Sequence, residues 1–167
     1  NMKIKYTFAA LAVLVMLSSC SSLPETPDQP LQVRTDIIKS PNDYRDYRYL
    51  VLANGLKVLL VSDPKADKSA ASLSVYRGSF DDPVDRPGLA HFLEHMLFIG
   101  TEKYPEPDGY FSYIQGNGGS SNAYTASEVT NYFFDVKPDS FLEGLDRFAQ
   151  FFIAPLLQKE YVEREKN

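Results

Sequence analysis

The sequence predicts an α+β fold, a two-layer sandwich in which helices pack on one face of a largely antiparallel sheet. The run "YLVLANGLKVLLVSDP" holds two β-rich stretches joined by Asn54-Gly55, which is a strong short signal for a hairpin. Apolar and polar residues then alternate over residues 71–76, as in a strand with one buried face. A helical pattern follows these three β segments, so we expect one sheet covered by helices on one side.

The first twenty residues precede this fold and have the pattern of a signal peptide. A short basic start leads into an apolar run at residues 8–17, which is too short to span a membrane. "LSSC" then ends in Cys20 and resembles the lipobox of bacterial lipoproteins, in which the cysteine is lipidated; a transmembrane anchor or a buried cysteine are the alternatives. Together with Ser21, the pattern predicts a protein of the bacterial cell envelope, anchored by a lipid on Cys20, facing the periplasm and favouring the outer membrane.

Composition separates a tether from the folded region. Residues 21–45 are polar and rich in proline, which predicts an extended tether, and residues 46–167 hold the domain. The 167-residue chain is 44% hydrophobic and has a formal net charge of -5. It therefore has enough apolar residues for a core. Because it lacks a basic block, the sequence argues against nucleic acid as a partner.

The next element is a helix over "GLAHFLEHMLFIG", residues 88–100. Apolar residues run through it without interruption. Asp85 is the candidate N-cap, Pro87 suits the first turn, and Gly100 suits the position just past the helix end.

Both histidines of the chain lie in this helix. His91 and His95 are four residues apart and share one face, with Glu94 at the edge of that face. Two imidazoles supply half of a tetrahedral zinc site, and a carboxylate beside them can act as a general base. Core histidines are the alternative, but a glutamate among apolar neighbours is costly to bury without a partner. The residues themselves therefore favour a Zn2+ site.

The following segments alternate between helix and strand. A helix is predicted over residues 109–115, with Asp108 as its cap. "GNGGSSNAYT", residues 116–125, breaks the periodicity, and its composition alone favours a flexible loop. "TNYFFDVK", residues 130–137, is predicted as a strand.

The last part of the chain is predicted to be helical. Ser140 is the candidate cap of a helix with one apolar stripe, which is expected to face the core: Phe141, Leu145, Phe148 and Phe152. Pro155 interrupts this helix, and "LQKEYVEREKN" begins a charged one.

Taken together, these motifs make the chain similar to the insulinase/pitrilysin family of zinc peptidases, the inverzincins, whose motif is H-x-x-E-H. "GLAHFLEHMLFIGTEKYP", "GSSNAYT", "TNYFFDV" and "LDRFAQFFIAPL" all resemble stretches of that family. Their sequences are closest to those of the long family members that are like insulin-degrading enzyme. The resemblance covers nearly all of residues 46–167 and implies the incomplete N-terminal part of a catalytic domain. It thus implies a truncated first domain of a multi-domain peptidase, with the remaining domains of the full-length chain as partners.

The resemblance also implies roles for individual residues. His91 and His95 look like the zinc-binding imidazoles, and Glu94 looks like the base that takes a proton from the water attacking the peptide carbonyl. Arg164-Glu165 resembles a pair that precedes the third zinc ligand of the family by seven residues. This implies that Glu165 supports the site without binding zinc and that the third ligand lies beyond Asn167.

"GSSNAYT" gains a role from the same resemblance. In the family, an edge strand at this place adds the substrate backbone as a further strand, so that an extended conformation is recognised more than a particular sequence. Ser121, Asn122 and Ala123 are the positions that carry over. Their small side chains would let one backbone approach another.

The implied function is that of a zinc-dependent endopeptidase acting on peptides or small unfolded proteins. One alternative is an inactive partner or peptide-binding subunit of the same fold, although such relatives usually lose one of the three motif residues that are present here. Another is a structural lipoprotein domain with buried histidines, for which zinc would not change thermal stability. With two zinc ligands and no closing half, the 167 residues alone are expected to bind zinc weakly and to show little or no peptidase activity.

Overall fold

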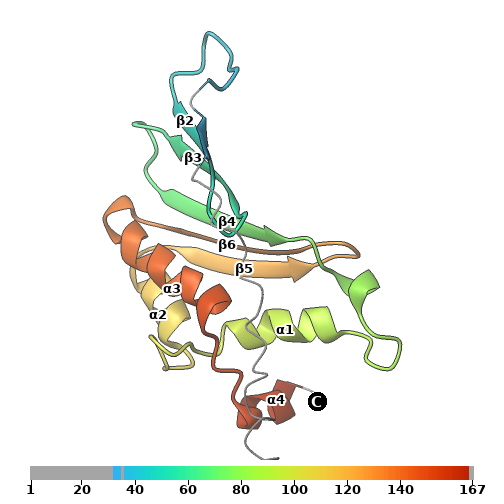
Figure 1. Ribbon diagram of the computed structural model, residues 1–167. Helices are drawn as coiled ribbons and strands as arrows, with labels where there is room; N and C mark the ends of the chain where they lie inside the picture. The colour runs from blue at the N-terminus through green and yellow to red at the C-terminus, as the bar shows by residue number, and fades with distance from the viewer. Residues whose placement is uncertain (1–31, 35, 166–167) are drawn as a thin grey trace, which may run out of the picture. The chain divides into compact units, whose positions relative to one another are not determined.

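The structure is a computed structural model that describes residues 32–34 and 36–165 (Figure 1). The chain divides into two compact units, the first ending at Pro64 and the second beginning at Lys65. The predicted signal peptide, Cys20 included, lies outside the described residues, and its division from the tether and the domain stays a prediction. Within the described part of the chain, no helix is both long and apolar enough to cross a membrane.

The first unit contains an antiparallel sheet in the order β1-β2-β3, formed by β1 (Gln32–Arg34), β2 (Asp46–Val51) and β3 (Lys57–Ser62). The predicted hairpin is confirmed, because β2 and β3 pair over their full lengths. Gly55 turns the chain with a φ of 83°, a conformation that residues with a side chain rarely adopt. The side-chain oxygen of Asn54 accepts a hydrogen bond from Leu56 N at 3.1 Å and closes the turn. β1 falls inside the range predicted as the tether.

The second unit contains a separate antiparallel sheet in the order β4-β6-β5, formed by β4 (Ser69–Val75), β5 (Ser120–Thr125) and β6 (Thr130–Val136). β6 is central and pairs with both neighbours. The sequence pattern suggested that the first three β segments share one sheet, whereas the third pairs with a strand some sixty residues further on (Ser69 lies opposite Val136). Alternation identifies a strand and its buried face, but it does not identify the strand's partner.

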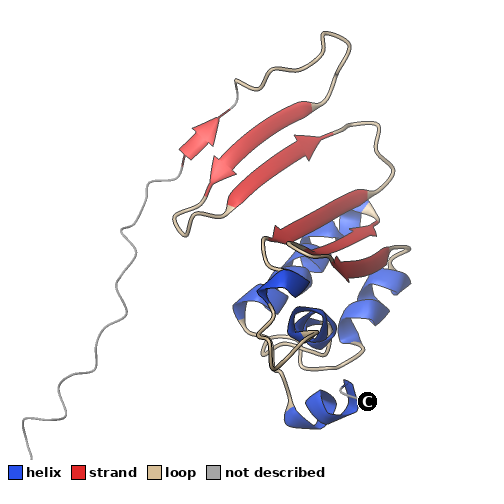
Figure 2. Ribbon diagram, turned by 90° about the vertical axis from the view of Figure 1, so that its right-hand side faces the viewer, coloured by secondary structure: helices blue, strands red, loops and turns tan. Residues whose placement is uncertain are grey.

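Helices cover one face of this second sheet (Figures 1 and 2). They are α1 (Leu89–Leu97), α2 (Gly109–Gly116) and α3 (Phe141–Ile153), with short 3-10 turns η1 (Ser79–Asp81) and η2 (Pro138–Ser140) and a last helix α4 (Lys159–Glu165). An α+β architecture with helices on one face of an antiparallel sheet is thus confirmed.

The core lies between this sheet and the helices. Alternate residues of β6 point toward the helices, and Tyr132, Phe134 and Val136 are almost completely buried. The helices contribute the remaining buried members, which are Leu97, Tyr110, Ile114, Phe148 and Phe151. Gly144 lets α3 approach closely, because a Cβ there would lie 3.1 Å from the ring of Phe134.

The predicted helices after α1 are present, but their caps differ from expectation. Asp108 and Ser140 occupy the N-cap positions of α2 and α3 without a side-chain cap hydrogen bond. Ser140 instead donates to the Asn117 side-chain oxygen at 2.8 Å. The apolar stripe of α3 faces the core as predicted, with Phe148 buried and the other three residues partly buried against it. The charged helix after Pro155 is α4.

Candidate active site

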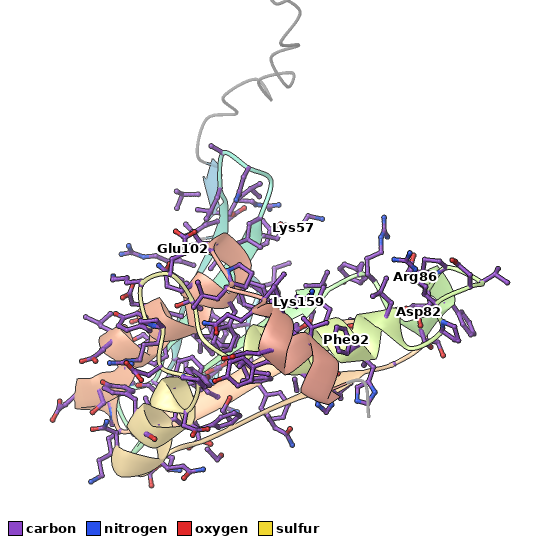
Figure 3. All side chains as sticks on the ribbon, turned by 90° about the horizontal axis from the view of Figure 1, so that it is seen from below. Lys57, Asp82, Arg86, Phe92, Glu102 and Lys159 are labelled. Atoms are coloured by element: carbon purple, nitrogen blue, oxygen red, sulfur yellow. The ribbon has the colours of Figure 1, made fainter. Side chains whose placement is uncertain are left out.

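α1 begins after a loop that folds back to cap it. Gly88 N and Ala90 N donate to the two carboxylate oxygens of Asp82 at 2.6 and 2.9 Å. These bonds satisfy backbone N–H groups that a helix start leaves without partners. Figure 3 labels Asp82 in the loop that leads into α1. Asp82 is therefore the capping side chain of this helix.

Two details of the predicted helix start are wrong. Asp85, the expected N-cap, is exposed and pairs at 3.7 Å with the neighbouring Arg86, and Pro87 lies before the helix and not in its first turn. The reason is that the chain reaches the N-cap position at Gly88, which has a φ of 88°. The capping carboxylate then comes from six residues upstream, outside the window in which a sequence pattern would seek it. α1 ends at Leu97 with Phe98 as its C-cap, so Gly100, which has a φ of 95°, lies two residues beyond the cap and not directly after the helix as predicted.

The two histidines of α1 converge on one point. His91 Nε2 and His95 Nε2 lie 3.1 Å apart, and the two rings are nearly perpendicular with centroids 4.7 Å apart. Both side chains are exposed on the helix surface. Two nitrogens that bind the same tetrahedral zinc at 2.0–2.1 Å would be about 3.3 Å apart. The pair can therefore share a proton in a hydrogen bond or share a metal ion.

Glu94 lies beside this pair but is buried, with 7% of its surface exposed. Its Oε2 accepts a hydrogen bond from the hydroxyl of Thr125, the last residue of β5. A buried carboxylate without a donor would be strongly destabilising. The charge of Glu94 is thus held next to the exposed imidazoles by a donor from the sheet.

The pKa of Tyr132 on β6 is affected by burial and by Glu94. Burial raises the pKa of its hydroxyl to about 12, and the nearby negative charge of Glu94 acts in the same direction. The phenol of Tyr132 therefore stays neutral well above neutral pH.

The donor set fits part of a zinc site. Among the described residues there is no group of three or more His, Cys, Asp or Glu side chains placed to hold a metal ion. The spacing of the two Nε2 atoms nevertheless matches two corners of a tetrahedron around zinc, and imidazole is one of the ligands that zinc prefers. His91 and His95 can hold the ion, and Glu94 is placed beside them.

The residues predicted to bind substrate lie on β5, which is an edge strand of the β4-β6-β5 sheet in the described part of the chain. Ser121 and Ala123 are half-buried toward the helices, and Asn122 is exposed. The Ser121 hydroxyl donates to the Phe133 carbonyl oxygen at 2.9 Å, and the Asn122 side-chain oxygen accepts from Ala123 N at 2.9 Å. In the stretch whose composition favours a loop, residues 120–125 therefore form an edge strand that ends at Thr125, whose hydroxyl donates to Glu94.

Two other predicted positions remain predictions. Glu165 is the last residue of α4, and its side chain is not described. Cys20 lies outside the described residues, and its lipidation would be tested by the loss of a metabolic lipid label in Cys20→Ser.

The structure adds three residues to the site that the sequence reasoning missed. Asp82 caps α1, and Thr125 donates a hydrogen bond to Glu94. Thr130 lies directly opposite Thr125 on the neighbouring strand β6. Thr125 and Ser121 are an even number of residues apart, so strand alternation places both on the face toward the helices. That alternation is the signal that could have found Thr125, once residues 120–125 were recognised as a strand.

Comparisons with known proteins show the family to which this sequence and fold are similar. The family described as "Insulinase (Peptidase family M16)" matches residues 57–167. "Insulin-degrading enzyme-like 1, peroxisomal" from Arabidopsis thaliana is 62% identical over 130 residues, which is 78% of this chain and 13% of that protein. "Insulin-degrading enzyme" from Drosophila melanogaster is 56% identical over 152 residues, which is 90% of this chain and 15% of that protein.

Among solved structures, the crystal structure of pitrilysin matches with a TM-score of 0.78 and 45% sequence identity, covering 82% of this chain and 15% of that one. The chain thus spans only about one seventh of the length of the relatives it matches.

The curated relatives also correct one prediction. The bacterial cell envelope was predicted as the location, yet these relatives come from a plant and an insect, and one is named as peroxisomal. The prediction rested on the charge and hydropathy of residues 1–20, which carry no information about the folded domain that these relatives share.

Proposed function

This chain belongs to the insulinase family, peptidase family M16, and from that membership we propose that it carries the metal-binding and base residues of a zinc-dependent endopeptidase. The substrates proposed are peptides or small unfolded proteins. One observation supports this above all. Two imidazole nitrogens 3.1 Å apart lie on the same short helix as a buried carboxylate that has a fixed donor.

His91 and His95 would hold the zinc ion through their Nε2 atoms. When bound there, zinc supplies a Lewis acid that polarises a carbonyl group and makes water more acidic. The third protein ligand is proposed to lie beyond Asn167, with Glu165 supporting it. Because both imidazoles are on one rigid turn, they need little reordering to bind the ion.

Glu94 would serve as the general base. Its carboxylate accepts a proton from the water that attacks the carbonyl carbon of the peptide bond, and it returns a proton to the amide nitrogen as that bond breaks. The burial of Glu94 strengthens these interactions, because an apolar surrounding screens charge less than water does. No covalent intermediate with the protein is needed for this reaction.

The edge strand β5 would bind the substrate backbone. Its outer side carries backbone groups available to a further strand, and Ser121, Asn122 and Ala123 offer little bulk along it. The exposed Asn122 side chain now accepts a hydrogen bond from Ala123 N. An incoming peptide carbonyl would replace that acceptor, so selectivity is expected to favour extended peptides over a particular sequence.

The test is Glu94→Gln in the protein expressed from its complete gene. Glutamine keeps the size of the side chain and removes the base, so zinc content should stay at the wild-type level while peptide hydrolysis falls by about 1000-fold or more. Glu143→Gln is the matched control, because Glu143 is an exposed residue of α3 paired with Arg147.

The two possible failures have different meanings. Hydrolysis that survives in Glu94→Gln removes Glu94 from the mechanism. A wild-type protein that binds zinc but hydrolyses no peptide would instead favour the alternative of a partner or peptide-binding subunit.

A further inference from the structure

We propose that Thr125 is a positioning residue for Glu94, and that Thr130 and the segment 77–82 hold Thr125 in place. The inference rests on the proposed function, because it assigns Thr125 the task of orienting the base. It concerns residues on three separate parts of the chain, which are the end of β5, the start of β6 and the loop before α1.

Thr125 contacts the proposed base directly. The Thr125 hydroxyl donates to Glu94 Oε2 from across the interface between β5 and α1. Because Glu94 is only 7% exposed, bulk water cannot readily replace that donor. One carboxylate oxygen of Glu94 is therefore directed toward the sheet. Because the two oxygens share one planar group, the same bond also limits the direction of the other oxygen.

Thr130 supports Thr125 from the neighbouring strand. Thr125 and Thr130 are directly opposite each other in the β5–β6 pair, and their hydroxyl oxygens lie 3.3 Å apart. Thr130 is 5% exposed and donates its single hydroxyl hydrogen to the Arg77 carbonyl oxygen at 2.9 Å. With that hydrogen committed, Thr130 presents only lone pairs to Thr125. The single hydrogen of Thr125 goes to the nearer acceptor, the carboxylate of Glu94, and Thr130 is left as the more distant acceptor that holds the Thr125 hydroxyl from behind.

The segment 77–82 contacts both the turn after β5 and the start of α1. Ser79 N and Phe80 N each donate at 2.9 Å to the backbone of the turn that joins β5 to β6. Gly78 allows this approach, because a Cβ there would lie 2.3 Å from the Ala126 carbonyl oxygen. The same segment ends at Asp82, whose carboxylate caps α1. One short stretch of chain thus fixes the end of β5 and the start of the helix that carries Glu94.

Together these contacts hold the carboxylate in one orientation. A threonine at position 125 supplies the donor, and a β-branched side chain has few rotamers in a strand. Groups that orient the residues around a metal site typically change activity by about 10–100-fold when they are removed. The loss of the Thr125 hydroxyl should therefore appear in the chemical step and not in substrate binding.

The contact itself is tested by thermal unfolding, without any activity. Thr125→Val, Glu94→Met and the double variant form a cycle, and the double variant should lose less Tm than the sum of the two single variants by roughly 3 °C or more. Thr101→Val is the matched control: Thr101 is buried and accepts from Tyr104 N, so its loss should add to that of Glu94→Met. Additive losses for Thr125→Val would overturn the proposal.

The positioning role is tested by kinetics in the protein expressed from its complete gene. Thr125→Val should lower kcat about 10–100-fold while KM and zinc content change by less than about threefold, and Thr125→Ser should restore kcat to within about threefold of the wild type. An unchanged kcat in Thr125→Val, or a Thr125→Ser variant no better than it, would overturn the role. A wild type that binds zinc without hydrolysis defeats the proposed function instead, and the thermal cycle then decides on the Thr125–Glu94 contact.

Discussion

Replacing Asp82 by alanine should loosen the start of the helix that carries the candidate site. Asp82 accepts two backbone hydrogen bonds at that start, from Gly88 N at 2.6 Å and Ala90 N at 2.9 Å. Loss of a single cap typically costs about 1 kcal/mol, and both bonds here use a charged acceptor, so we expect the upper end of the range, about 2 kcal/mol. For a chain of this size, that corresponds to a fall in Tm of roughly 4–8 °C.

The assay is thermal unfolding followed by circular dichroism, with Asp85→Ala as the matched control. Asp85 is exposed and pairs only loosely with Arg86 at 3.7 Å, so its loss should change Tm by less than about 1 °C. Asp82→Asn should fall between the two, because the amide keeps one acceptor oxygen. Equal effects of Asp82→Ala and Asp85→Ala would show that Asp82 does not cap α1, as would an unchanged Tm in Asp82→Ala.

Three further predictions concern the second unit. Phe134→Ala removes a fully buried ring from the centre of the core and should cost about 3–5 kcal/mol in urea unfolding; a loss below about 1 kcal/mol would show that the ring is not tightly packed. Burial raises the pKa of Tyr110 and Tyr132 to about 12, so the free energy of unfolding should fall as the pH rises from about 10 to 12, because the unfolded chain loses those protons first. Ultraviolet absorbance should show both phenols titrating near pH 12, and titration of both near pH 10 would contradict this. Gly78→Ala places a Cβ against the Ala126 carbonyl oxygen and should lower stability by about 1–3 kcal/mol; an unchanged denaturation midpoint would rule out the close approach.

Local patterns predicted the elements of this fold well. The Asn54-Gly55 hairpin, α2 and α3 follow from signals contained within a few residues. The helix with His91 and His95 was also predicted from its own residues, since a spacing of four places two side chains on one face.

Long-range pairing was beyond the same patterns. Neither the pairing of β4 with β6 nor the division into two sheets leaves a signal in the periodicity of either strand. Asp82 and Thr125 were missed for the same reason, because each acts on a residue that folding brings to it from another element. Composition alone favoured a loop at residues 121–123. The resemblance to a family implied an edge strand there, and the structure has one.

The two imidazoles of α1 are proposed to hold a zinc ion beside a glutamate base. The most direct measurement is anomalous diffraction at the zinc absorption edge from crystals of the protein expressed from its complete gene. We expect one anomalous peak at about 2.0–2.1 Å from both His91 Nε2 and His95 Nε2. A zinc-loaded protein whose peak lies elsewhere, or contacts neither nitrogen, would contradict it.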